Sequence, residues 1–260
     1  MTGSDHPPDG PPAGSAFGIA TAVRHGLDLA ADLLLGARCC ACSRPAIGLC
    51  MPCLGAVRAE VPHPVVPRPA PPGWPLCVGA GTYRGPAARA VVAYKDRGAL
   101  TLAPVLGGRL ALAVAELLVR ADGWDPAVGV ALVPMPSARA AVRRRGLDAT
   151  TVLARQAAAR LRRVSGMRHR QVGVRRLLRQ RSGVVDQSGL SSSQRVANLR
   201  GALRTRSSPT ALEPGLIVVD DVVTTGASIA EAVATLRRAG WPVIGAATVT
   251  ATQKVGCSGA

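Results

Sequence analysis

The sequence predicts an α/β protein in which a doubly wound, parallel sheet follows a small cysteine-rich module. The apolar run at residues 216–219 has no polar face, as is typical of a strand buried on both sides of a parallel sheet, and further apolar strands are predicted at 128–133 and 243–249. Helical patterns at 149–161 and 229–239 separate them, so strands and helices alternate along the chain. Five of the seven cysteines lie together before these elements.

The composition predicts a substantial hydrophobic core and an anionic partner. The chain has 260 residues, of which 48% are hydrophobic, and its formal charge is +17. So large a basic excess predicts attraction to phosphate groups, either on a small ligand or on a nucleic acid. A GC-rich genome would explain why the cations are Arg, but not why so few acids balance them. Only 2% of the residues are aromatic, which argues against nucleic-acid binding by base stacking and leaves contacts to the phosphates.

The N-terminal part of the chain predicts neither a secretory signal nor a membrane span. Residues 1–15 are rich in Pro, Gly and Asp and are expected to form a disordered tail. Charged residues interrupt the apolar stretches at 16–36 and 100–119, so we expect amphipathic helices there and no membrane insertion. The expected location is the cytoplasm.

Two Cys-x-x-Cys pairs follow the first predicted helix: Cys39 with Cys42, and Cys50 with Cys53. Four thiolates on two such knuckles supply the tetrahedral ligand set of a structural zinc ion. Disulfides are the alternative, but they are disfavoured in a cytoplasmic chain. Cys40 is a spare that could replace Cys39 as a ligand. The two remaining cysteines, expected to be small buried residues, are Cys77 and Cys257.

A proline-rich stretch divides the chain. Seven prolines occupy residues 61–75, and because this density opposes both helix and strand, a semi-rigid linker is expected. The predicted organisation is a helix plus zinc module at 16–60, then the linker, then a large domain at 76–253 whose first strand spans 76–83. A short tail is expected at 254–260.

Residues 216–228 place the parts of a binding site in thirteen positions. A buried strand ends in Asp220 and Asp221, and Thr224, Thr225 and Gly226 then lead into a helix. Backbone amides at a helix start, with hydroxyls beside them, cradle a phosphate. Two adjacent carboxylates accept hydrogen bonds from neighbouring sugar hydroxyls. The ligand implied is a ribose that carries a 5-phosphate.

Parts of this stretch have simpler explanations. The carboxylates could end a strand of a nucleoside triphosphatase, but the chain lacks the G-x-x-x-x-G-K-[ST] loop of that class. Ser228 precedes Glu231 by three residues, so it could only cap the helix. Replacing Asp221 by Ala is expected to change stability little, because two carboxylates at an open strand end repel one another.

Other candidate positions surround this stretch. Lys95, one of two lysines, stands at a predicted helix end, where its ammonium could contact a phosphate, donate a proton or simply be solvated. A second anion-binding loop is predicted at 134–139, after a strand. Residues 165–214 are rich in Arg and Ser, and so long an irregular stretch is either disordered or functional.

In this order the motifs resemble those of the ComF family, whose members have a type I phosphoribosyltransferase-like fold with an N-terminal zinc module and are linked in some bacteria to DNA uptake during natural transformation. The resemblance covers about residues 30–253. The matching features are the four-Cys module, Tyr94 and Lys95, residues 133–136, residues 145–148, Gln187, residues 189–190, Arg195, Asn198 and residues 219–228. Three places depart from the family pattern: Leu147 and Asp148 replace Phe and Asn, Leu203 replaces an aromatic residue, and Ser228 replaces Thr. The added negative charge argues against a ligand role for Asp148.

The resemblance implies that the chain binds 5-phosphoribosyl 1-diphosphate (PRPP) with Mg²⁺ and that its zinc is structural. The residues implied for PRPP binding are Asp220, Asp221, Val222, Val223, Thr224, Thr225, Gly226, Ala227 and Ser228. Those implied for catalysis are Lys95, Arg145, Asp220 and Asp221. The pyrophosphate loop corresponds to Pro136, Ser137, Ala138 and Arg139. The hood that closes over the substrate contains Arg179, Gln187, Arg195 and Asn198, of which Asn198 could equally be a capping or turn residue.

Two functions are consistent with this resemblance and with the basic charge. One is a cytoplasmic phosphoribosyltransferase that transfers or recognises a 5-phosphoribosyl group, with an acceptor that the sequence does not identify. The other is an accessory protein of DNA uptake that senses PRPP or holds single-stranded DNA without turnover. Its expected partners are PRPP and either single-stranded DNA or a DNA-uptake helicase.

Overall fold

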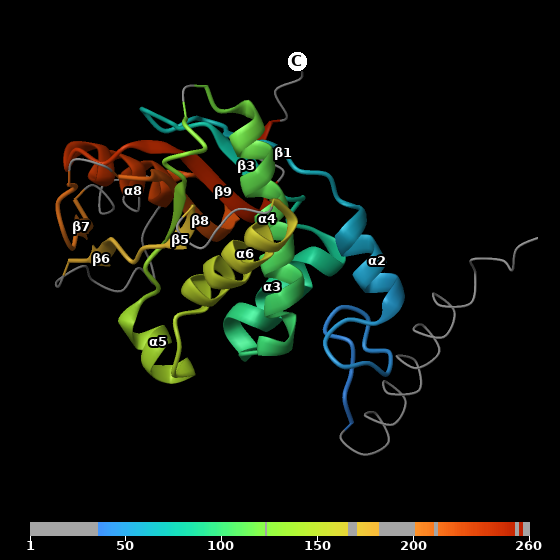
Figure 1. The fold of residues 1–260 in the computed structure, drawn as a ribbon. Coiled ribbons are helices and arrows are strands. Elements are labelled where there is room, and N and C mark those ends of the chain that lie inside the picture. Colours follow the sequence, from blue (N-terminus) through green and yellow to red (C-terminus); the bar gives the residue numbers. More distant parts are fainter. Residues whose placement is uncertain are drawn as a thin grey trace, which may run out of the picture.

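The computed structural model describes residues 36–122, 124–165, 171–181, 201–210, 213–252 and 255–256. Figure 1 shows a central sheet with helices on both of its faces, and the cysteine-rich segment beside it at α2. The predicted α/β class is confirmed. Several predictions lie outside the described residues: the tail at 1–15, nearly all of the helix at 16–36, Gln187, Arg195, Asn198 and Cys257.

Within the described residues, six strands form the central sheet in the order β1-β3-β9-β8-β4-β5. Their bounds are β1 (His63–Pro64), β3 (Cys77–Gly79), β4 (Val130–Pro134), β5 (Val172–Val174), β8 (Gly215–Val223) and β9 (Val243–Ala251). Every neighbouring pair is parallel except β1 with β3. The predicted parallel sheet is therefore confirmed, with one antiparallel strand at its edge.

The helices form two layers. One face of the sheet carries α3 (Gly85–Arg97), the short η1 (Leu100–Leu102), α4 (Ala103–Arg120) and α6 (Ala149–Ser165), and the other carries α8 (Ala227–Arg238). Strand β8 separates two hydrophobic clusters, because Ile217 and Val219 pack toward α4 and α6 while Leu216 and Val218 pack toward α8. All four side chains are 0% exposed, so the prediction of a strand buried on both faces is confirmed.

The proline-rich residues 61–75 form part of the edge of the sheet, so the prediction that they exclude a strand is wrong. Strand β1 pairs with β3, and β2 (Val66–Pro67) pairs with β10 (Val255–Gly256), which lies in the predicted C-terminal tail. Val65 is 1% exposed and its backbone N–H donates to the carbonyl of Cys77. Edge strands tolerate proline because their outer side needs no donor.

The cysteine-rich segment shares the core of the large domain instead of standing apart from it. Leu49, Leu54 and Val57 belong to the same buried cluster as the residues of α4 and α6. Helix α2 (Met51–Ala59) is held by Arg109 of α4, whose guanidinium donates to the carbonyls of residues 58, 60 and 80 and is 5% exposed. The predicted boundary at 61–75 is therefore not a break in packing.

Helix α4 explains the long apolar stretch that the sequence predicted to be an amphipathic helix. Among the described residues, Leu100–Arg120 is the one helical segment whose length and mean hydropathy, 1.8, would suit a membrane span. Within its most apolar window, 56% is buried inside the protein, where it packs on β9 and α6. Its apolar composition follows from its place in the core.

Candidate functional site

The candidate site lies where β4 ends beside the last part of β8. Pro134 at the end of β4 is paired with Val219, and the backbone N–H of Met135 donates to the carbonyl of Val219 (2.9 Å). Strand β8 runs on through Asp220 and Asp221 to Val223 and stays paired with β9, so the loop after β4 leaves the sheet beside the two carboxylates. This is the carboxyl edge, where open α/β sheets bind ligands.

The two adjacent carboxylates have different surroundings. Asp221 is 3% exposed, and the Lys95 Nζ lies 3.0 Å from its Oδ1 and 2.9 Å from its Oδ2. Asp220 is half-buried and forms no ion pair among the described residues. Its Oδ1 accepts a hydrogen bond from the backbone N–H of Asp221 (2.9 Å). The premise of an open strand end is therefore wrong for Asp221, which is buried and neutralised, while Asp220 remains free to accept from a ligand.

The pKa values of Asp220 and Lys95 are both raised by their surroundings. Burial, together with the negative charge of Asp221, raises the pKa of Asp220 well above its ordinary value. Burial alone would lower the pKa of Lys95, but the charges of Asp221 and Asp220 outweigh it and raise that pKa. The ammonium is therefore held in its charged form beside the two acids.

The predicted phosphate loop presents unused hydrogen-bond donors. The side chains of Thr224 and Thr225 are exposed, and that of Ser228 is half-buried. Among the described residues, no acceptor is found for these three hydroxyls or for the backbone N–H groups of residues 224–226. These donors stand at the start of α8, where the helix dipole favours an anion. These donors are of the kind that the predicted phosphate loop requires.

The alternative role of Ser228 as a helix cap is wrong. Helix α8 begins at Ala227, and its N-cap is Gly226, so Ser228 lies within the first turn. Glu231, the supposed partner in a capping box, accepts instead from the backbone N–H of Gly201 (2.8 Å) and from the Thr235 hydroxyl (3.1 Å).

Gly226 is required by the fold as well as by any ligand. Its φ of +76° lies in the left-handed region that favours glycine. A Cβ there would come within 2.5 Å of the Trp74 ring and 2.6 Å of Pro67. The proline-rich segment thus packs directly behind the phosphate loop. Sequence reasoning missed Trp74, because nothing in a proline-rich stretch indicates which distant loop it covers.

The loop after β4 is held by Asp148. The Ser137 hydroxyl donates to Asp148 Oδ1 (2.9 Å), which also accepts from the backbone N–H of Thr151 (3.3 Å) in the first turn of α6. Arg176 lies 3.8 Å from the other carboxylate oxygen. Asp148 therefore orients the loop and the start of the helix through these contacts.

The basic side chains predicted at the site differ in whether they are free to contact a ligand. Arg145, on α5 (Arg139–Arg145), donates to the carbonyls of Lys95 and Ala141, so its guanidinium braces the end of α3. Arg143 is exposed, and the side chain of Arg139 lies outside the described residues. Tyr94 donates from its hydroxyl to the carbonyl of Ala149 (2.8 Å), and burial raises its pKa to about 12. Among the cations that the structure describes, Lys95 alone forms an ion pair with the acidic pair.

A small hairpin borders the site. It consists of β6 (Leu178–Gln180) and β7 (Leu203–Thr205), in which Arg179 stands directly opposite Arg204 and both are exposed. The side-chain amide of Gln180 lies 3.5 Å from the carbonyl of Pro136 in the loop after β4. Of the four predicted hood residues, Arg179 alone lies in the described part of the chain.

The four predicted metal ligands come together. The sulfur atoms of Cys39, Cys42, Cys50 and Cys53 all lie within 4.8 Å of one another. Tetrahedral zinc with Zn–S bonds of about 2.3 Å separates its sulfur ligands by roughly 3.8 Å, so the cluster fits a zinc ion. All the described cysteines are free, and Cys40 is not part of the cluster.

The thiols of the cluster differ in acidity. Burial opposes the charged form of Cys39, but hydrogen bonds from the backbone of Cys50, Ala41 and Cys42 together lower its pKa to about 6. Burial raises the pKa values of Cys50 and Cys53. Cys77 behaves as the predicted small core residue, since it is 2% exposed and burial raises its pKa to about 12.

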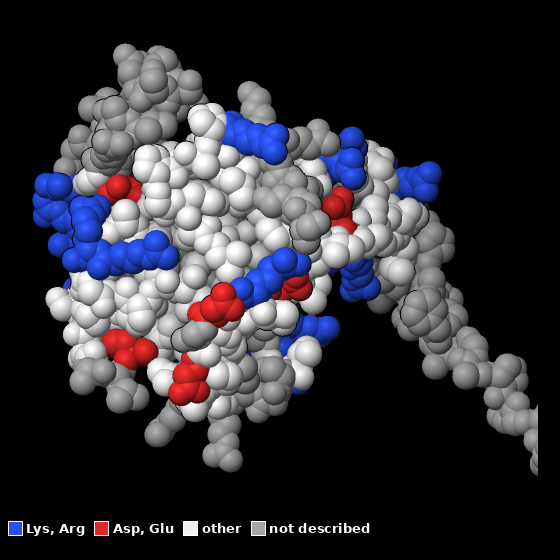
Figure 2. Space-filling view, turned by 90° about the horizontal axis from the view of Figure 1, so that it is seen from above, with Lys and Arg blue, Asp and Glu red and all other residues white. Residues whose placement is uncertain are grey.

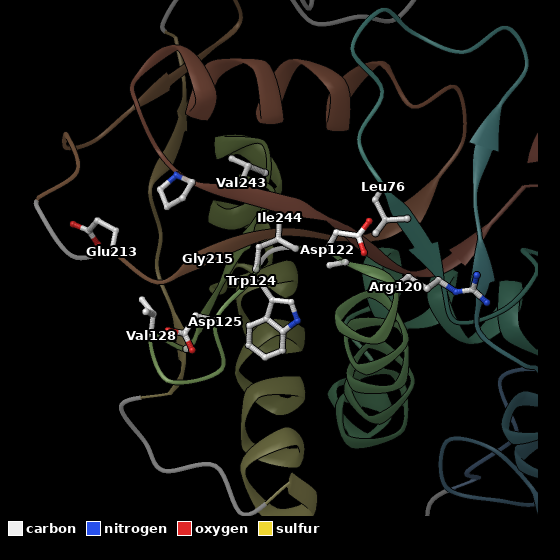
Figure 3. A pocket seen from close by; sticks show the side chains of 13 residues that line it. Leu76, Arg120, Asp122, Trp124, Asp125, Val128, Glu213, Gly215, Val243 and Ile244 are labelled. Carbon is white, nitrogen blue, oxygen red and sulfur yellow. The ribbon is translucent and has the colours of Figure 1, made fainter.

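A cavity of about 700 Å³ lies at the opposite, amino edge of the sheet. Figure 3 shows Trp124 and Ile244 at this cavity, with Asp122 and Asp125 nearby. Glu213, which also lines it, pairs with Arg175 and accepts from Thr210, whose hydrogen bonds lower the pKa of that carboxyl to about 2. An acidic lining does not suit a phosphate, so we do not place the anion site here.

No protein-family model matches the chain, and a search of the curated proteins finds no match either. Its function is therefore inferred from its own residues and their geometry.

Proposed function

We propose that the protein binds PRPP at the carboxyl edge of its sheet and transfers or recognises the 5-phosphoribosyl group. The observation that carries this proposal is the row of unused donors at residues 224–228 directly beside the half-buried Asp220. The resemblance to the ComF family supports the same ligand, together with a type I phosphoribosyltransferase-like fold and a link to DNA uptake.

Each part of PRPP has a matching group. The 5-phosphate would accept hydrogen bonds from the backbone amides and the hydroxyls of residues 224–228. The ribose hydroxyls would donate to Asp220, while Asp221 holds Lys95 in place (2.9 Å). The side chain of Lys95 is 49% exposed, so its ammonium can also approach the diphosphate near the loop at 135–138. Asp220 would also help to hold Mg²⁺ when it binds with PRPP, and the ion would neutralise negative charge on the diphosphate.

Transfer would need little covalent participation by the protein. The bond between the ribose C1 and the diphosphate oxygen breaks, and a bond from C1 to the incoming nucleophile forms. Positive charge develops on the ribose and negative charge on the leaving diphosphate. Asp220 would stabilise the positive charge on the ribose, and Lys95 the negative charge on the diphosphate. The protein would therefore act mainly by positioning the reactants and by neutralising charge.

The test is calorimetric titration of PRPP with Mg²⁺ into wild type and Asp220→Asn. The amide keeps the acceptor for the backbone of Asp221 but loses the charge, and a charge-assisted hydrogen bond contributes about 1.5–3 kcal/mol, so affinity should fall roughly tenfold or more. Asp125→Asn, at the amino edge, is the matched control and should bind like wild type. A wild type that does not bind PRPP would overturn the proposal. Equal binding by Asp220→Asn would refute the role of Asp220 alone.

Release of pyrophosphate distinguishes an enzyme from a sensor. Wild type incubated with PRPP, Mg²⁺ and a panel of acceptors should release pyrophosphate with at least one of them if the protein is a transferase. Binding without release, across the whole panel, would favour a PRPP sensor.

A second candidate function is the binding of single-stranded DNA, and the pair formed by Arg179 and Arg204 favours it. Like charges directly opposite each other on two strands destabilise a hairpin unless an anion bridges them. Figure 2 shows that basic side chains also form patches elsewhere on the surface. Affinity for a single-stranded oligonucleotide should fall steeply with salt, because each neutralised phosphate releases a counterion. Binding that does not respond to salt would exclude this mode.

A further inference from the structure

Helix α3 touches both the cysteine cluster and the acidic pair. The guanidinium of Arg89 donates to the carbonyl of Ala41, which lies in the loop between Cys39 and Cys42. Six residues later, Lys95 contacts Asp221 (2.9 Å). Figure 1 shows α3 between the segment that carries α2 on one side and α5 and α6 on the other.

The two contacts leave different sides of one rigid element. Successive residues of a helix are about 100° apart, so Arg89 and Lys95 point in directions roughly 120° apart around the axis. Ala90, Val91 and Tyr94, all at most 1% exposed, pack α3 into the core. A displacement of the Arg89 side of α3 is therefore transmitted to Lys95 and is not absorbed within the helix.

We propose that metal occupancy of the four-cysteine cluster sets the position of Lys95 and thereby the affinity of the site for PRPP, with Arg89 as the positioning residue that couples the two. This inference rests on the proposed function. When the cluster holds zinc, the loop that contains Ala41 is crosslinked to α2 through Cys50 and Cys53. Without metal that crosslink would be absent, and the carbonyl that anchors Arg89 would be held only by the backbone hydrogen bonds and the packing of its loop.

Coupling between two binding sites is reciprocal. If zinc strengthens PRPP binding by a given factor, PRPP must strengthen zinc binding by the same factor. We expect a factor of about five, at the low end of the usual range of roughly 5–150, because Tyr94 also anchors α3 through Ala149.

The first experiment measures zinc affinity by competition with a zinc-selective chelator, in the presence and absence of PRPP and Mg²⁺. Wild type should hold zinc about fivefold more tightly when PRPP is present. Asp220→Asn is the matched control, because its cysteine cluster is unchanged and only its PRPP site is weakened, so it also corrects for zinc bound by PRPP itself.

The second experiment tests Arg89. Arg89→Met should retain zinc but bind PRPP about fivefold more weakly, and Arg89→Lys should recover part of the loss. Arg58→Met is the matched control, since Arg58 is an exposed arginine of α2 and its side chain has no hydrogen bond or ion pair within the described residues. In a Lys95→Met background the Arg89→Met change should have no further effect, because Arg89 acts through Lys95.

The outcomes separate this inference from the function on which it rests. If wild type binds no PRPP, the proposed function fails. If wild type binds PRPP, but zinc affinity is the same with and without it and Arg89→Met binds as tightly as Arg58→Met, the coupling is overturned and the function stands. If Arg89→Met weakens binding equally with and without Lys95, Arg89 only supports the fold.

Discussion

Asp220 and Asp221 are adjacent in sequence but have opposite environments. Side chains of a strand alternate between its faces, so Asp221 lies on the same face as Ile217 and Val219, where α3 supplies Lys95. Asp220 has no such partner among the described residues, so burial and the neighbouring negative charge disfavour its ionised form. The sequence predicted the pair as a unit, because no local pattern shows which distant helix will supply a cation to one of its members.

Asp221→Ala should destabilise the protein. The change removes the partner of Lys95 and an acceptor for the backbone N–H of Val222 (2.9 Å). Because Lys95 is about half exposed, water can replace part of the lost contact, so we expect a loss of about 1–2 kcal/mol in the free energy of unfolding. Urea denaturation of wild type and variant measures this loss. Unchanged stability would mean that the ion pair contributes nothing.

Asp220→Asn should stabilise the protein at neutral pH. A carboxyl whose pKa is raised on folding binds protons more tightly in the folded state, so its contribution to stability falls as pH rises from the unfolded value of about 4 through the raised folded value. Asparagine removes that penalty, so we expect a higher free energy of unfolding at pH 7 and no gain near pH 4. Denaturation at both pH values tests this, with Asp125→Asn as control. A gain independent of pH would contradict the assignment.

At the scale of elements, long apolar segments were predicted well and short or proline-rich ones were not. The runs at 128–133 and 243–249 became β4 and β9, and the helical pattern at 149–161 became α6. Strands β1 and β2 were missed because their prolines argue against strand locally, yet pairing with β3 and β10 places them at an edge. Three-residue strands such as β5 are too short to show the alternation of apolar and polar residues that marks a strand.

The cysteine cluster is the part of the candidate sites whose geometry the sequence predicted best, because the spacing of paired Cys-x-x-Cys motifs is itself a local pattern. Freshly reduced protein should carry about one zinc per chain by elemental analysis. Cys50→Ser should lose it, whereas Cys40→Ser should keep it, since Cys40 lies outside the cluster. Loss of zinc in Cys40→Ser, or retention in Cys50→Ser, would mean that the ligand set is different.

At the scale of the whole molecule, the structure predicts one cooperative unit where the sequence suggested two regions joined by a linker. The cysteine-rich segment and the sheet share one buried cluster, and Arg109 joins them through three backbone carbonyls. Thermal unfolding of the zinc-loaded protein should therefore show a single transition. Cys50→Ser should lower the midpoint of that whole transition. Two separate transitions would show that the segment folds on its own.

The packing of Trp74 against Gly226 gives the protein an intrinsic optical probe. Trp74 is one of three tryptophans, and the other two lie elsewhere, Trp124 at the amino-edge cavity and Trp241 near Arg175. With Trp124 and Trp241 replaced by Phe, fluorescence emission would come from the indole behind the phosphate loop alone. Titration with PRPP and Mg²⁺ should then change the emission of that indole, while inert ligands should leave the spectrum unchanged. Occupancy of the loop could thus be followed in real time without attaching a dye.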